Sequence, residues 1–201
     1  MSVDTHLAFD SPRVHIGLDF DGVLCDIHGY ATKHIQENHA PDFTRNDIEW
    51  DGSIPNTDLT MGDIMWEFAG DPDVLTETNP VPGAIKHANW LANHPFADPI
   101  IVTHRPPEIH DNIEKWLARH GFPDIELPSN IPDNKTNADT SFDVLIDDYH
   151  KHVLDAVNDG SHGIHFTGAW ESTTLNHPDT YSVSSWTQLR ELLETSLKQL
   201  E

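Results

Sequence analysis

The chain has almost no cysteine, no long hydrophobic run and no apparent leader segment. Its single cysteine, Cys25, excludes a disulfide bond within the chain and is expected to be an inert core residue. No stretch of about 18 apolar residues occurs, so the sequence predicts no transmembrane helix. The opening residues, MSVDTHLAFDSPR, lack both the basic start and the apolar core of a signal peptide. We therefore expect a protein of the cytoplasm.

Positive charge is also scarce. The 201 residues contain 11 Lys and Arg against 34 Asp and Glu, a formal net charge of −23. Affinity for nucleic acid polymers and for anionic membranes depends on cationic side chains, so this balance argues against both as partners. Self-repulsion of this size is screened at molar salt, so we expect a halophilic cytosol. An acidic protein from an ordinary organism is the alternative.

Apolar runs and amphipathic stretches alternate along much of the chain. Hydrophobic residues make up 37% of it, which is enough for the core of one α/β domain with an elaboration. The alternation is typical of parallel βαβ units. The predicted strands are 14–20, 99–103, 124–127, 142–146 and 163–166. The predicted helices lie within 84–92, 109–121, 153–157 and 186–200.

Residues 24–82 interrupt this alternation. They separate the first predicted strand from its helix by about sixty residues, whereas a βα loop usually has 2–6. The segment contains helical patches of its own and begins at the carboxyl end of a strand, where ligands bind in open parallel sheets. We therefore expect a core made by residues 1–23 and 82–201, and an inserted, mostly helical cap made by residues 24–81.

Two carboxylates end the first predicted strand. Asp19 and Asp21 are two positions apart, so strand alternation points both to the same side, and Gly22 then allows a sharp turn. Close carboxylates repel each other unless a cation joins them or one takes a proton. Either arrangement suits phosphoryl chemistry, in which one carboxylate attacks and the other handles protons. A pair of aspartates that only caps a turn is the alternative.

A second acidic pair, Asp147 and Asp148, follows the predicted strand 142–146. Parallel strands bring their carboxyl ends to one edge of a sheet, so we expect these acids to converge on Asp19 and Asp21. Four acids in one cleft are very unfavourable without a cation, and carboxylate oxygens of this kind suit Mg²⁺. For this pair taken alone, a solvated turn is the alternative.

Candidate phosphate-binding residues occur at two further places in the chain, around Thr103 and at Lys135. Thr103 ends the predicted strand 99–103 and can donate a hydrogen bond to a phosphate oxygen. Lys135, one of six lysines, can hold a phosphate as a point charge. His104 and Arg105 come next to Thr103 and are expected to border the pocket, where Arg105 contacts phosphate or ties down a loop. A helix cap at Thr103 and a solvated Lys135 are the alternatives.

The order of these motifs resembles that of the haloacid dehalogenase superfamily of phosphohydrolases, over residues 14–170. The order is DxDGV, a strand ending in Thr, a Lys, and a strand ending in DD. The segments GLDFDGVLCD, PVPGA, VTHRP and KTN…FDVLIDD are most similar to the 5′(3′)-deoxyribonucleotidase (cytosolic type C 5′-nucleotidase) family. The resemblance implies a Rossmann-like α/β core, with a five-stranded parallel sheet of order 3-2-1-4-5, and a small type-1 cap.

The resemblance also implies a role for each motif residue. Asp19 is then the nucleophile that forms an aspartyl-phosphate, and Asp21 protonates the leaving alcohol and afterwards activates water. Thr103 and Lys135 bind the phosphoryl group, and His104, beside Thr103, is a further candidate for phosphate binding. The implied Mg²⁺ ligands are Asp19, the main-chain carbonyl of Asp21, Asp147 and Asp148, the last directly or through water.

The function implied is Mg²⁺-dependent hydrolysis of a small phosphorylated substrate, a (deoxy)nucleoside monophosphate. Another small phosphometabolite, such as a sugar phosphate, is the first alternative, and a non-catalytic phospholigand-binding protein is the second. Three cap aromatics, Trp50, Trp66 and Phe68, can stack on a nucleobase, or can simply form the cap's own core. The chain has fifteen histidines, but no cysteine cluster accompanies them, so we expect no zinc site.

Overall fold

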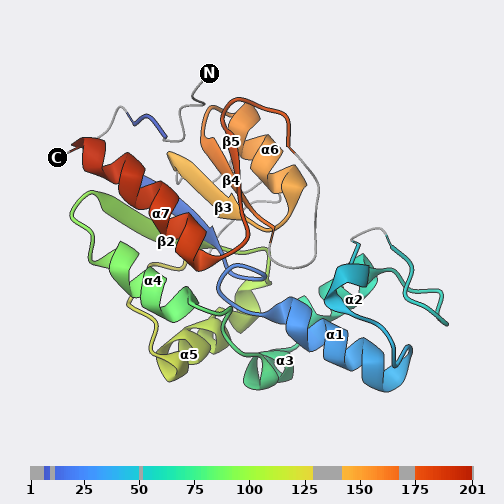
Figure 1. Ribbon diagram of the computed structural model, residues 1–201. Coiled ribbons are helices and arrows are strands. Elements are labelled where there is room, and N and C mark those ends of the chain that lie inside the picture. Colours follow the sequence, from blue (N-terminus) through green and yellow to red (C-terminus); the bar gives the residue numbers. More distant parts are fainter. Residues whose placement is uncertain (1–6, 10–11, 50–51, 129–141, 168–174, 201) are drawn as a thin grey trace.

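A parallel sheet of five strands lies at the centre of the structure (Figure 1). The computed structural model describes residues 7–9, 12–49, 52–128, 142–167 and 175–200. The strands are β1 (Val14–Asp19), β2 (Ala97–Val102), β3 (Val144–Asp147), β4 (His162–Phe166) and β5 (Thr180–Val183). Their order across the sheet is β2-β1-β3-β4-β5, and every neighbouring pair is parallel. This arrangement confirms the predicted α/β class.

Helices cover both faces of the sheet, which explains why the strands are apolar on both sides. Val14, Ile16 and Leu18 of β1 belong to the main hydrophobic cluster, together with residues of α4 (Ala84–Ala92), α5 (His110–His120) and α7 (Trp186–Leu197). On the other face, α6 (His150–Asn158) packs so closely that a Cβ on Gly163 would lie 2.6 Å from a methyl group of Val153. A sheet buried on both faces is typical of parallel α/β folds.

The end of α5 and the start of α7 lie where the sequence predicts. Gly121 ends α5 in the left-handed conformation, with φ of 79°, and the hydroxyl of Ser185 accepts the N–H of Gln188 at the start of α7. Three short 3₁₀ segments complete the regular structure among the described residues: η1 (Arg45–Asp47), η2 (Pro107–Ile109) and η4 (Lys198–Leu200).

One predicted strand is reduced to a single bridge at its predicted place in the sheet order, and one strand was not predicted. Residues 124–127 form only a single parallel bridge, between Glu126 and Ile100, beside β2 at the sheet edge. Pro123 and Pro128 flank this stretch and have no N–H to extend the pairing. The fifth strand is instead β5, which pairs with β4 at the opposite edge. The other four predicted strands lie in the expected spatial order.

Three helices between β1 and α4 lie below the sheet (Figure 1). They are α1 (Ile27–Asn38), α2 (Met61–Ala69) and α3 (Pro72–Glu77). Residues between Ile27 and Val74 make a hydrophobic cluster of their own, distinct from that of the sheet. We refer to residues 26–79 as the insert. The expected cap boundaries, 24 and 81, stay a prediction.

The two ends of the insert are held side by side. The N–H of Asp26 donates to the carbonyl of Asn79 at 2.8 Å, and the N–H of Val81 donates to the carbonyl of Leu24 at 2.9 Å. An antiparallel bridge between Cys25 and Pro80 lies between these two bonds. The insert therefore leaves and rejoins the core at one place. Among the described residues, no helix has the length and apolar character needed to cross a membrane.

Candidate active site

The chain turns sharply directly after β1. The N–H groups of Leu24 and Cys25 both donate to the carbonyl of Phe20, and the N–H of Gly22 donates to the carbonyl of Cys25. Gly22 has a φ of 75°, and a Cβ there would lie 1.7 Å from a carboxylate oxygen of Asp148. Only glycine fits this position, because the backbone conformation is left-handed and the Asp148 side chain occupies the space of a side chain.

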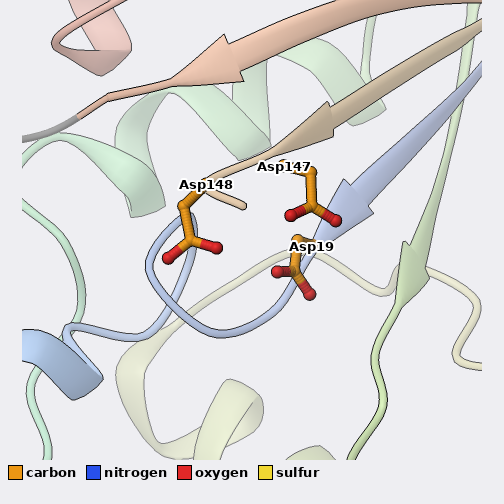
Figure 2. Close-up of side chains that lie close together, drawn as sticks. All are labelled: Asp19, Asp147 and Asp148. Atoms are coloured by element: carbon orange, nitrogen blue, oxygen red, sulfur yellow. The ribbon is translucent and has the colours of Figure 1, made fainter. Parts of the chain in front are cut away.

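Three buried carboxylates converge beside this turn. Asp19 ends β1, Asp147 ends β3 and Asp148 follows it, and Figure 2 shows their side chains facing one another. One oxygen from each lies within 4.8 Å of the others. All three are buried, and Asp147 is 0% exposed. Repulsion between anions is strong in such surroundings, so the set fits a hard divalent cation, which prefers carboxylate oxygens. These residues could hold a metal ion.

His28 and His152 contact carboxylate groups of this cluster. His28, at the start of α1 in the insert, lies with its Nε2 2.7 Å from Oδ2 of Asp148, and both side chains are buried. His152 of α6 lies with its Nδ1 3.1 Å from Oδ2 of Asp147. Asp147 also accepts the N–H of Tyr149 at 2.8 Å. Contacts of this kind orient the carboxylates that ligate a metal.

Asp21 is engaged differently, by an arginine. The guanidinium of Arg105 donates from Nε to Oδ2 of Asp21 at 2.7 Å and from Nη2 to Oδ1 at 2.9 Å. Burial alone lowers the pKa of Arg105, but the charge of Asp21 and its hydrogen bond offset this, and the pKa stands above its usual value. Both oxygens of the Asp21 carboxyl group therefore accept hydrogen bonds from Arg105, at the side of the acid cluster.

A pocket of about 420 Å³ lies between the core and the insert. The core contributes the polar side of its lining, which is Asp19, Asp21, His104, Arg105, Asp148, Tyr149 and His152. The insert contributes the other side, which is Thr60, Gly62, Asp63, Met65, Trp66 and Ala69. A concave site with a few convergent polar groups is typical of small-molecule binding.

The predicted phosphate-binding residues lie at different distances from this pocket. His104 lines it, whereas Thr103 is buried beneath, where its Oγ1 accepts the N–H of Arg105 at 3.1 Å. This bond closes a turn after β2 and does not cap a helix, because neither η2 nor α5 has a side-chain cap. Lys135 lies outside the described residues.

The three predicted cap aromatics also differ in where the structure places them. Trp66 of α2 lines the pocket and is 68% exposed. Phe68 is 4% exposed and packs against the rings of Tyr30 and His34 in the insert's own cluster, as the core alternative expects. Trp50 lies outside the described residues.

Sequence reasoning missed the histidine partners of the acids. His28 is 120 residues from Asp148 in the chain, and nothing in its sequence neighbourhood indicates this contact. His152 is one of the fifteen histidines, for which the sequence suggested only the zinc role that was set aside. Cys25, by contrast, is fully buried as expected, and burial followed by the charge of Asp21 raises the pKa of its thiol well above the usual value.

Solved structures with a similar fold are haloacid dehalogenase-like hydrolases. One, from Streptococcus pneumoniae, has a TM-score of 0.58 and 17% sequence identity, over 90% of this chain and 99% of the other. Another, from Xanthomonas campestris, has a TM-score of 0.55 and 14% identity, over 94% of this chain and 97% of the other. The fold is therefore that of the haloacid dehalogenase superfamily.

The family can be stated more narrowly. Residues 13–200 match the model of the family described as 5′ nucleotidase, deoxy (pyrimidine), cytosolic type C protein. The match spans nearly the whole chain, so the protein belongs to this family. No curated protein matches the chain. The resemblance expected from the motifs is thereby confirmed for both superfamily and family.

A divalent cation should stabilise the fold by relieving repulsion among Asp19, Asp147 and Asp148. With free Mg²⁺ at 100 times its dissociation constant, we expect Tm to rise by about 5–10 °C over the value in EDTA. Thermal melts with and without Mg²⁺ measure this rise. Asp147→Asn should abolish it, while Asp155→Asn, a change to an exposed acid on α6, should leave it intact. An equal rise in all three proteins would contradict a metal site at this cluster.

Proposed function

We propose that the protein is a Mg²⁺-dependent phosphomonoesterase that hydrolyses (deoxy)nucleoside monophosphates through an aspartyl-phosphate. One observation carries the proposal. Asp19 and Asp21 both line one pocket, beside the buried acids Asp147 and Asp148, in a chain that belongs to a nucleotidase family. A nucleophile, a proton carrier and a candidate cation site are thus within reach of one bound phosphate.

The first half of the proposed reaction transfers the phosphoryl group to the enzyme. A carboxylate oxygen of Asp19 attacks phosphorus, and the bond from phosphorus to the ester oxygen breaks. The electron pair of that bond stays with the ester oxygen, which takes a proton from the carboxyl group of Asp21 and leaves as the alcohol. Asp19 then carries the phosphoryl group, and Asp21 is a carboxylate.

The second half returns both residues to their starting state. Asp21 takes a proton from water while the water oxygen bonds to phosphorus, and the bond from phosphorus to the Asp19 oxygen breaks. Inorganic phosphate leaves. The net change is one water consumed for each ester hydrolysed, so a single proton carrier serves both halves.

Charge neutralisation completes the proposal. Mg²⁺, held by Asp19, the carbonyl of Asp21, Asp147 and Asp148, would offset the charge of the phosphate and of the acids around it. Thr103, His104 and Lys135 are the proposed phosphate-binding residues of the chain. His28 and His152, through their contacts with Asp148 and Asp147, would keep the two carboxylates oriented.

The size and lining of the pocket support a small substrate. A volume of about 420 Å³ suits a metabolite-sized ligand, and the exposed ring of Trp66 offers an apolar surface for a base. The net charge of −23 counts against a nucleic acid polymer and against a membrane surface. A sugar phosphate would leave Trp66 without a planar partner, so the nucleotide is the substrate we propose.

Replacing Asp19 by Asn should abolish turnover, because an amide oxygen is a far poorer nucleophile than a carboxylate. We expect phosphate release from deoxy- and ribonucleoside monophosphates, assayed with Mg²⁺ in molar KCl, to fall at least about 10³-fold. Asp98→Asn, at the opposite end of the strands, is the matched control and should stay active. The same panel includes sugar phosphates.

Each result of this panel has a distinct meaning. Release from nucleotides that is lost only in the Asp19 variant supports the whole proposal. Release restricted to sugar phosphates would keep the chemistry and reject the nucleotide. Folded, Mg²⁺-binding protein that releases no phosphate would favour a non-catalytic phospholigand-binding protein.

Removing the ring of Trp66 should weaken nucleotide binding specifically. Stacking of a base on an aromatic side chain contributes about 1–3 kcal/mol, so Trp66→Ala should raise KM for a nucleotide about 5- to 150-fold. KM for p-nitrophenyl phosphate, which has no base, should change much less. Leu59→Ala is the control, since Leu59 is the other exposed large apolar side chain among the described residues of the insert. A uniform rise for both substrates would argue against base stacking.

The acidic surface supports a cytoplasm rich in salt. At about 1 M salt the Debye length falls to about 3 Å, so repulsion among exposed carboxylates is largely screened. We expect Tm to rise steadily between low and molar KCl at constant free Mg²⁺. A Tm that is constant or falls over this range would refute the halophilic interpretation.

A further inference from the structure

Arg105 is a buried cation that the proposed reaction leaves without a role. It lies three residues beyond the end of β2 and is 3% exposed, although arginine is almost never buried without a specific partner. Its backbone is fixed by the bond from its N–H to the hydroxyl of Thr103, at 3.1 Å. The position of this guanidinium is therefore set by the core. Arg105 also lines the pocket, so a role in the reaction is expected of it.

The guanidinium group of Arg105 donates two hydrogen bonds to Asp21. Bonds of 2.7 Å from Nε and 2.9 Å from Nη2 engage both carboxylate oxygens, which fixes the plane of the carboxyl group as well as its distance. A lysine at this position would offer a single charged point and could not fix that plane. Asp21 itself is only partly buried and borders the pocket, so without this grip its side chain would have room to turn.

Two further contacts hold the guanidinium still. Its carbon lies 5.5 Å from the centre of the Phe20 ring, in the turn between Asp19 and Asp21. Its third nitrogen, Nη1, lies 3.4 Å from the carbonyl oxygen of Phe68, near the end of α2 in the insert. One side chain thus joins the end of β2, the turn after β1 and the insert.

We propose that Arg105 is a positioning residue that fixes the orientation of the Asp21 carboxyl group toward the ester oxygen of the substrate. This inference rests on the proposed function, because it concerns the residue assigned to proton transfer. It replaces the direct phosphate contact that the sequence left open for Arg105. Two of the three guanidinium nitrogens already bind Asp21, and the third faces a carbonyl group of the protein.

If Arg105 acts by positioning Asp21, its loss should affect the two substrates differently from the loss of a direct contact between Arg105 and phosphate. Proton donation matters most when the leaving alcohol is a poor one, as in a nucleoside monophosphate, and little for p-nitrophenyl phosphate. General acid catalysis contributes about 10²–10⁴-fold, so a misoriented Asp21 should cost a large part of that factor. A lost phosphate contact would instead weaken binding of both substrates and slow both alike.

The test is a double-mutant cycle with Arg105→Lys and Asp21→Asn. Release of the leaving group is followed in the first turnover, so that the later hydrolysis step does not enter. We expect Arg105→Lys to slow the nucleotide about 10- to 100-fold and p-nitrophenyl phosphate less than about 3-fold, with KM nearly unchanged. In the Asp21→Asn background, Arg105→Lys should cause no further loss.

Arg119→Gln is the matched control. Arg119 of α5 also donates from the core to the insert, to the carbonyl oxygens of Leu75 and Thr76 at 3.2 Å each, but it does not contact Asp21. Arg119→Gln should leave unchanged the ratio between the first-turnover rates for the nucleotide and for p-nitrophenyl phosphate. Thermal melts of every variant, and of Arg105→Gln as a second replacement, separate loss of folding from loss of orientation.

Several outcomes would overturn the inference. Losses that add in the double variant, or equal losses for both substrates with a raised KM, would assign Arg105 to the phosphate. If both Arg105 variants fail to fold while Asp21→Asn folds, Arg105 is a stability residue. A wild-type protein that releases no phosphate from any substrate would overturn the proposed function, and this inference with it.

Discussion

The crowding of carboxylates at one edge of the sheet is the constraint on which the rest of the site depends. Parallel strands bring Asp19 and Asp147 together because their carboxyl ends meet, and burial then removes the water that would screen them. The surface cannot compensate, since the whole chain carries a net charge of −23. Compensation must therefore be local, from side chains such as Arg105 and from a cation that the acids could bind.

The polar contacts of the site come from both the core and the insert. Asp148 belongs to the core, but its partner His28 comes from α1 of the insert. Arg105 belongs to the core, but one of its nitrogens faces a carbonyl group of α2. The charged groups of the site are therefore arranged jointly by core and insert. A shift of the insert would change the surroundings of Asp148 and Arg105 as well as the size of the pocket.

The sequence predicted those parts of the structure that depend on neighbouring residues. The strand that ends at Asp19, the turn at Gly22 and the end of α5 at Gly121 all follow from local patterns. Local patterns also misled, since 124–127 reads as a strand but lies between two prolines, and β5 is too short and polar to stand out. The contacts of Asp21 with Arg105 and of Asp148 with His28 join residues 84 and 120 positions apart. Such pairs form only when the tertiary fold brings their elements together.

The insert leaves and rejoins the core through two hydrogen-bonded segments, and this has a consequence for how the pocket can change between related proteins. The two chains that enter and leave the insert are joined by backbone hydrogen bonds around the bridge between Cys25 and Pro80. Backbone bonds of this kind tolerate many side chains, and they hold the two ends at a constant spacing whatever lies between them. From the side of the core, the insert is a closed loop, so its length and sequence can change at little entropic cost to the sheet. New pocket walls can therefore arise by exchange of this one segment, while the acids at the strand ends stay in place.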